Sequence, residues 1–213
     1  MNKLTEKAFE FSKTGVFSYV DVLVWLDGSR DSVNGIVKRA IGAGEILHIH
    51  RGLYCLAGKY NRHVLDRNVF ANLIYGPSYI SMETALSIHR WIPEAVHSVI
   101  SVSLGRAKSF ETTLGVFDYM QVKQRPLFSG VERMKTGEEP LTYFVAKPLK
   151  ALADYVASHK KDWTGREPLE ESLRIEPESL DELQPADFNE LEGVYKSRRA
   201  RKFLEGLRME LGK

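Results

Sequence analysis

The sequence lacks most of the features that mark a secreted or membrane protein. It has one cysteine, Cys55, among 213 residues, so it can form no internal disulfide and offers no cysteine cluster for zinc. No apolar run is long enough to cross a bilayer, and the opening stretch MNKLTEKAFEFSK lacks the continuous apolar core of a signal peptide. We therefore expect a soluble cytoplasmic protein that does not associate with membranes.

Signatures of catalysis are also missing. The chain contains no Walker loop, no H-E-x-x-H motif, no G-x-S-x-G turn and no G-x-G-x-x-G motif. Thirty Lys and Arg residues stand against 28 Asp and Glu, so the overall charge does not by itself indicate a nucleic-acid partner. We expect neither an enzyme nor a bound cofactor, and local patterns must indicate the function.

The first 58 residues show the pattern of three short helices followed by a hairpin. Apolar residues recur at helical spacing in 4–12 and after Ser18, which forms a capping pattern with Asp21. A third helix, which Ser29 or Ser32 can cap, is predicted from its apolar repeat of Val33, Ile36, Val37, Ala40 and Ile41. From Leu47 the apolar residues alternate, which indicates a hairpin that turns at Arg51-Gly52. This order predicts a winged helix-turn-helix domain over residues 1–58.

Residues 61–213 have the pattern of an α/β domain. Its predicted strands are 99–104, 109–113, 116–123 and 141–146, and its predicted helices are 65–75, 82–89 and a third that begins near Pro148. Residues 167–192 then hold ten acidic and one basic side chain, whereas 196–213 hold seven basic and two acidic ones. The predicted fold class is α+β: a winged helix-turn-helix, then an α/β domain with a small mixed sheet and C-terminal helices.

The third predicted helix carries residue types that read DNA. Arg30, Asn34 and Lys38 recur every four residues away from the apolar repeat, with Arg39 beside them. Arginine and asparagine can pair with the edges of guanine and adenine, whereas lysine more naturally contacts phosphate. The hairpin would add a wing with His48, His50 and Arg51. The alternative is an ordinary surface helix with solvated strand histidines.

Two groups of residues support other readings. Asp118 and Lys123 resemble part of a nuclease metal site, which would need further carboxylates such as Glu83 and Glu111. His48 and His50 share a face of their predicted strand, but no third ligand lies in register nearby, so we expect no metal there. A metal-dependent nuclease is the alternative function that these residues leave open.

The C-terminal segment 196–213 predicts a basic amphipathic helix, in which Phe203, Leu207 and Leu211 repeat every four residues. Its candidate partner-binding residues are Arg198, Arg199, Arg201 and Lys202. Three roles are open: pairing with the acidic segment 167–192, contact with DNA phosphates, or docking of a protein partner.

Several segments together resemble the AbiEi family, the antitoxins of type IV toxin–antitoxin systems, over residues 3–160. The segments that carry the resemblance are Gly44-x-Ile46-x-x-Ile49-x-Arg51-Gly52-x-Tyr54, Tyr79-Ile80-Ser81-x-Glu83-Thr84-Ala85-Leu86-Ser87-x-His89, Phe110-Glu111-Thr112 and Ala146-Lys147-Pro148-x-Lys150-Ala151-Leu152-x-Asp154. The sequence departs from the family pattern at His48, at Arg90-Trp91 and at Lys147.

The resemblance implies a function in abortive infection, the defence of bacteria against phage. A protein of this kind represses its own operon by binding double-stranded operator DNA, here expected to contain inverted repeats. It also counters a nucleotidyltransferase-like toxin, without the need for a stable complex with it. Carried over to this sequence, the DNA-reading residues are Arg30, Asn34, Lys38, Arg39 and Arg51. The segment from Tyr79 to His89 is expected to form the fold and not to catalyse, and a stand-alone regulator without a toxin is the alternative.

Overall fold

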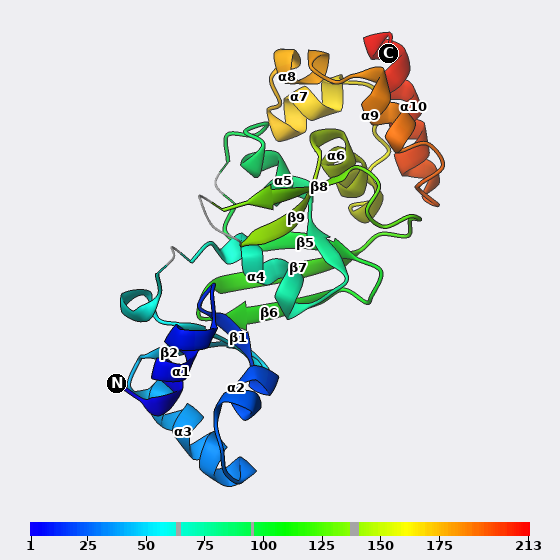
Figure 1. Ribbon diagram of the computed structural model, residues 1–213. Helices are drawn as coiled ribbons and strands as arrows, with labels where there is room; N and C mark the ends of the chain where they lie inside the picture. The colour runs from blue at the N-terminus through cyan, green and yellow to red at the C-terminus, as the bar shows by residue number, and fades with distance from the viewer. Residues whose placement is uncertain (63–64, 95, 137–140) are drawn as a thin grey trace.

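The computed structural model describes residues 1–62, 65–94, 96–136 and 141–213. The chain is mixed α+β, as predicted, and its parts follow one another in three tiers (Figure 1). An N-terminal unit lies at one end, a six-stranded sheet in the middle, and a group of C-terminal helices at the other end. In the described ranges no helix combines the length and the apolar character needed to cross a membrane.

The N-terminal unit contains three helices and a three-stranded sheet. Its elements are α1 (Lys3–Phe11), β1 (Val16–Ser18), α2 (Tyr19–Trp25), α3 (Arg30–Gly42), β2 (Ile46–His50) and β3 (Leu53–Leu56). The predicted cap of α2 is confirmed, because Ser18 and Asp21 form a reciprocal capping box. Strand β1 was not predicted: it is three residues long, and it pairs with β3 from almost forty positions further along the chain.

The small sheet lies between two apolar clusters. Ile46, Tyr54 and Leu56 pack with α1, α2 and α3, whereas Ile49 and Cys55 belong to the core of the six-stranded sheet. Leu47 and Ile49 both pack against the core of the six-stranded sheet, as the predicted alternation requires, but a bulge between His48 and His50 shifts the register against β3. The hairpin therefore joins the two cores. A 3₁₀ turn at Gly58–Tyr60 follows it.

The six-stranded sheet has the order β6-β7-β5-β4-β9-β8. Its strands are β4 (Ser78–Ile80), β5 (Val99–Ser103), β6 (Lys108–Thr112), β7 (Gly115–Gln121), β8 (Val131–Lys135) and β9 (Thr142–Ala146). The pairs β5–β7 and β4–β9 are parallel and the other pairs antiparallel. Strands β4 and β8 were not predicted from the sequence. Strand β8 is a polar edge strand, a kind that the apolar pattern does not reveal.

Helices cover both faces of this sheet. Helix α4 (Arg67–Ile74) lies on one face, where the Tyr119 hydroxyl donates a hydrogen bond of 2.6 Å to the carbonyl of Ala71. Helices α5 (Met82–Ile88) and α6 (Pro148–Ser158) lie on the other face, where the Tyr79 hydroxyl donates to Asp154 at 2.7 Å.

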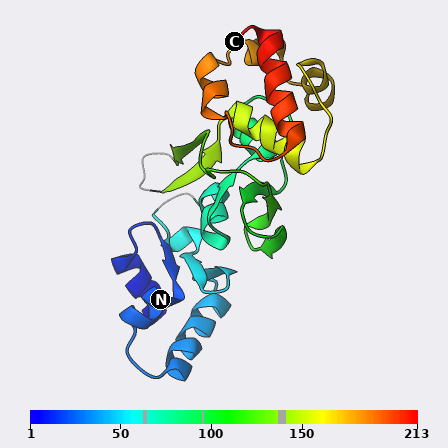
Figure 2. The same ribbon diagram turned by 90° about the vertical axis from the view of Figure 1, so that its right-hand side faces the viewer.

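The C-terminal helices are α7 (Glu167–Leu173), α8 (Pro177–Asp181), α9 (Pro185–Glu190) and α10 (Arg198–Leu211). The predicted amphipathic character of α10 is confirmed, since Ala200, Phe203 and Leu207 are buried. Figure 2 shows α10 beside α6, at the end of the molecule opposite α3.

Candidate nucleic-acid interface

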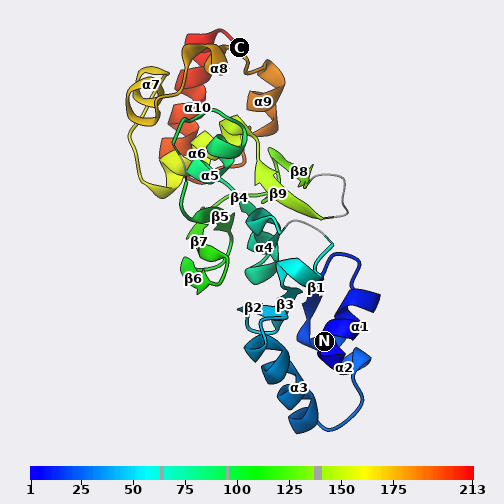
Figure 3. The same cartoon turned by 90° about the vertical axis from the view of Figure 1, so that its left-hand side faces the viewer.

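Helix α3 turns its apolar side inward and leaves the predicted DNA-reading residues on its surface. The Ser29 side chain accepts a hydrogen bond from the amide of Ser32 and so caps the helix. Val33, Val37 and Ala40 are buried against the N-terminal core. The exposed side chains include Arg30, Asn34, Lys38 and Arg39. Because α3 points away from the six-stranded sheet, the sheet does not cover this surface (Figure 3).

Tyr19 connects three elements at this surface. Its hydroxyl donates a hydrogen bond of 2.7 Å to the side-chain oxygen of Asn34, and its backbone amide donates one of 2.8 Å to the carbonyl of Gly52. The first residue of α2 therefore holds both the middle of α3 and the tip of the hairpin, beside the exposed Arg51. Tyr19 is not among the residues that the sequence predicted for this surface. The only signal for it is an aromatic residue directly after the Ser18 cap.

Arg39 lies on a different side of α3 from this contact. A Cβ atom at position 35 would lie 3.4 Å from Nη1 of Arg39, so the guanidinium lies back over Gly35. A glycine in the middle of a helix costs about 1 kcal/mol of helix stability relative to alanine. At position 35 the missing side chain leaves room for the guanidinium of Arg39 close to the backbone.

The two hairpin histidines have different surroundings. His48 is exposed, with its ring 5.3 Å from that of Tyr54. The ring of His50 meets that of Phe110 in β6 edge-on at 4.8 Å, so His50 lies where the hairpin contacts the six-stranded sheet. Burial lowers the pKa of His50, and the positive charges of His48, Arg51 and Lys108 lower it further. His50 is thus less open to a ligand than His48.

The cations of this surface have no acidic partner within the described part of the chain. None of Arg30, Lys38, Arg39 and Arg51 forms an ion pair with a described residue. Their charges are therefore available to an anionic ligand such as a phosphate backbone.

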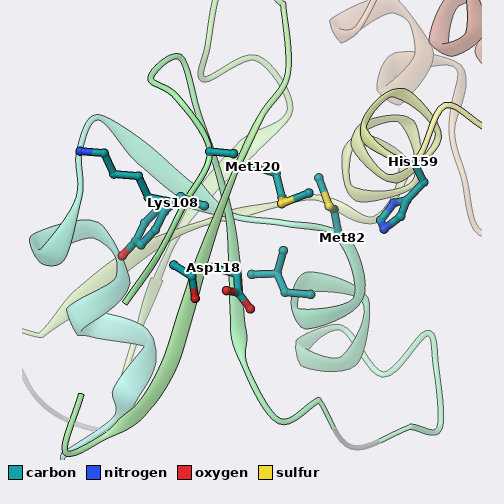
Figure 4. A pocket seen from close by; sticks show the side chains of 9 residues that line it. Met82, Lys108, Asp118, Met120 and His159 are labelled. Carbon is teal, nitrogen blue, oxygen red and sulfur yellow. The ribbon is translucent and has the colours of Figure 1, made fainter. Parts of the chain in front are cut away.

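The residues of the nuclease alternative are not assembled into a site. Asp118 lines a hollow of about 390 Å³ beside Met82 and Met120 (Figure 4), and it is the one carboxylate among the described residues that line it. Lys123 lies beyond the end of β7 and does not line this hollow. Among the described residues no three His, Cys, Asp or Glu side chains are grouped so that they could hold a metal ion.

The structure does not support the alternative in which the basic residues of α10 pair with the acidic segment 167–192. Arg199 pairs with Asp162 at 2.8 Å, outside that segment, while Arg198, Arg201 and Lys202 are exposed. Within this segment, Glu170 and Asp181 pair with Arg166, and Glu190 pairs with Lys147. None of its acidic side chains forms an ion pair with a described residue of α10. The exposed cations of α10 therefore form a second positively charged surface.

Four residues meet in one buried cluster, and they come from two of the segments that carry the resemblance to the AbiEi family, which we call the family-like segments. The hydroxyls of Tyr79 and Ser81 both donate to Oδ2 of Asp154 at 2.7 Å. The ammonium of Lys150 lies 3.6 Å from Oδ1 of Asp154, and both residues are fully buried. Burial lowers the pKa of Lys150, although the charge of Asp154 opposes this effect.

Two residues that the sequence analysis did not single out complete the cluster. The Tyr195 hydroxyl donates to Oδ1 of Asp154 at 2.8 Å, and the side-chain oxygen of Gln124 accepts a hydrogen bond from Lys150. Burial, followed by the negative charge of Asp154, raises the pKa of Tyr195 well above its ordinary value. The cluster ties β4, α6 and the segment before α10 together, which is a structural role.

Two comparisons of the sequence with known proteins found no match. No model of a known protein family matches the chain, and a search of curated proteins found no similar sequence.

Proposed function

We propose that this protein is a sequence-specific DNA-binding regulator whose residues 1–58 form a winged helix-turn-helix. Helix α3 is the recognition helix and the β2–β3 hairpin is a short wing. One observation carries the proposal: α3 exposes Arg30, Asn34 and Lys38 along one ridge, without ion pairs to described residues, beside the hairpin tip. Such a ridge can enter a major groove while the hairpin contacts the backbone.

The contacts divide by chemistry. Arg30 and Asn34 are assigned to base edges, and Lys38, Arg39 and Arg51 to phosphates. Tyr19 holds the Asn34 carboxamide by its oxygen, so the amide NH₂ is left to donate to an acceptor on a base. His48 lies on the wing, while His50 mainly contacts Phe110.

Binding of the upstream promoter DNA tests the proposal. Arg30→Ala is expected to weaken specific binding by about tenfold or more, because a bidentate contact to a base discriminates by about 1–3 kcal/mol. Lys38→Ala should weaken binding to all sequences and make it less dependent on salt. Arg133→Ala and Lys135→Ala are the matched controls, because both residues are exposed on β8, far from α3. Unchanged binding by both α3 variants would remove α3 from the interface.

We further propose that the regulator represses its own operon and acts as an antitoxin of the AbiEi type against a nucleotidyltransferase-like toxin. The support is the resemblance, together with the joint burial of Tyr79, Ser81, Lys150 and Asp154 from two of the family-like segments. If a nucleotidyltransferase from the same operon stops the growth of cells that express it alone, co-expression of this protein should restore their growth. DNA binding without rescue of growth would favour the stand-alone regulator.

The exposed cations of α10 are the proposed partner-binding residues. Arg201→Glu combined with Lys202→Glu should reduce rescue and leave DNA binding unchanged, because α10 lies at the opposite end from α3 (Figure 1). Full rescue by this variant would exclude α10 from neutralisation.

A further inference from the structure

The hollow of about 390 Å³ beside Asp118 lies over strands β5, β6 and β7 of the six-stranded sheet (Figure 4). Asp118 and Met120 of β7 line it together with Ile100 of β5, which is the register partner of Asp118. All three residues are partly exposed, so a ligand in the hollow can touch each of them. A volume of this size falls within the usual range for small-molecule sites.

Asp118 brings a negative charge to this hollow that no described residue pairs with. Its carboxylate forms no ion pair and no hydrogen bond with the described part of the chain. Lys108 of β6 also lines the hollow, but it lies opposite Tyr119 in the register of β6 and β7. Because side chains alternate along a strand, the Lys108 side chain leaves on the other face of the sheet, where its ammonium lies 4.6 Å from the centre of the Tyr75 ring. The charge of Asp118 is therefore available to a ligand.

His159, directly after α6, forms the far side of the hollow and is exposed. Its Nδ1 atom lies 3.1 Å from the carbonyl oxygen of Tyr155, and because a carbonyl can only accept, this nitrogen carries the proton. In the neutral ring Nε2 is then a hydrogen-bond acceptor. Figure 4 shows Met82 and Met120 between His159 and Asp118. The hollow thus offers acceptors on two sides of an apolar floor, which favours a ligand with N–H donors.

The lining fits an aromatic ring that carries two neighbouring N–H donors. A carboxylate can accept two parallel N–H bonds from one planar group, as it does from a guanidinium. The thioether of Met120 can make favourable contacts with an aromatic ring, and Ile100 adds apolar surface beside it. An anionic ligand would be repelled by the charge of Asp118, so the hollow selects against it.

We propose that this hollow binds a small aromatic molecule with two adjacent N–H donors, such as an aryl amidine or an amino-substituted heteroaromatic base. The donors pair with the Asp118 carboxylate, and the ring packs on Met120 and Ile100. The site lies on the six-stranded sheet, at a distance from α3 (Figure 1). The proposal goes beyond the proposed function and does not depend on DNA binding.

Three probes with the same flat ring test the donor requirement in the wild-type chain. Benzamidine, benzamide and benzoate are titrated while ¹³C-labelled methionine methyl groups are followed by NMR. The Met120 signal should shift saturably with benzamidine, with a Kd at least about tenfold lower than for the other two probes. The signal of Met209, which is exposed on α10, is the internal control and should stay in place. Equal binding of benzamide, or equal shifts of Met120 and Met209, would overturn the proposal.

A capped Gly-Arg-Gly peptide tests the need for a ring. Its guanidinium offers the same pair of N–H donors as benzamidine, but no ring is present to pack on Met120 and Ile100. The peptide should therefore bind at least about tenfold more weakly than benzamidine. Equal or tighter binding of the peptide would replace the small aromatic ligand by the arginine side chain of a protein and so refute the proposal.

Two substitutions test the assignment of Asp118. Asp118→Asn keeps the shape of the side chain and removes its charge, and it should weaken benzamidine binding by about tenfold or more. Ser109→Arg at the exposed register partner on β6 places a guanidinium beside Asp118 and should abolish this binding. Glu111→Gln is the matched control, because Glu111 is an exposed carboxylate of β6 that does not line the hollow. Unchanged binding by a folded Asp118→Asn or Ser109→Arg protein would refute the assignment.

Discussion

Replacement of Asp154 by alanine should lower the free energy of unfolding by about 3–5 kcal/mol, the usual cost of removing one partner from a buried ion pair. Asp154 is fully buried and accepts hydrogen bonds from Tyr79, Ser81 and Tyr195. Its removal leaves three buried hydroxyls without their acceptor and leaves the buried ammonium of Lys150 without a counter-ion. Among the described residues Asp154 is the carboxylate that pairs with Lys150, whereas Glu190, whose charge acts on Lys150 less, pairs with Lys147.

Urea unfolding followed by circular dichroism measures this loss. Asp162→Ala is the matched control, because Asp162 is exposed and pairs with Arg199 at the surface at 2.8 Å. An exposed pair contributes at most about 1 kcal/mol, so the control should shift the free energy of unfolding only slightly. A loss below about 1 kcal/mol for Asp154→Ala would refute the assignment of the cluster as a stabilising network.

A double variant separates the charge from the shape. Lys150→Met with Asp154→Leu removes both buried charges, and the remaining cost should be smaller than that of Asp154→Ala alone. The reason is that the largest part of the single-variant cost comes from the unpaired ammonium and not from the lost contact. If the losses of the two single variants simply add in the double variant, this reasoning is wrong.

Three further predictions follow from the N-terminal unit. Because the folded protein lowers the pKa of His50, the unfolded chain takes up the proton first, so stability should fall as the pH drops below 6.5; His50→Gln should flatten that dependence in urea midpoints. Burial raises the pKa of Cys55 to about 12, so a thiol reagent should label it in urea but not in the native protein, and rapid native labelling would contradict its burial. Tyr19→Phe removes the hydrogen bond to Asn34 and should weaken operator binding roughly two- to tenfold, with unchanged binding of non-specific DNA as the internal control.

Local signals made part of the fold predictable. Helix α3 has an apolar repeat and a Ser29 cap, both of which lie within its own segment. Strand β4 has no such signal: its three residues are a strand because β5 and β9 flank them on either side. Strand β8 is polar and is stabilised by pairing with β9. Neither pairing can be derived from residues that are close in the sequence.

The same distinction applies to the candidate site. The exposure of Arg30, Asn34 and Lys38 follows from the helical period alone. The partner of Asn34 does not, because Tyr19 lies in another helix. Likewise, the surroundings of His50 depend on a bulge and on Phe110 of a distant strand, which no pattern within the hairpin reveals.

The hairpin also limits how far residues 1–58 can act alone. Ile49 and Cys55 are buried in the core of the six-stranded sheet, so a cut after residue 58 would expose them to water. Exposing a buried aliphatic side chain such as Ile49 costs about 1.5–3 kcal/mol, a large share of the stability of a domain of this size. Since Tyr19 joins the hairpin tip to α3, any disturbance of the hairpin reaches the exposed side of α3. Operator binding should therefore require the six-stranded sheet, although none of the proposed base contacts lies on it.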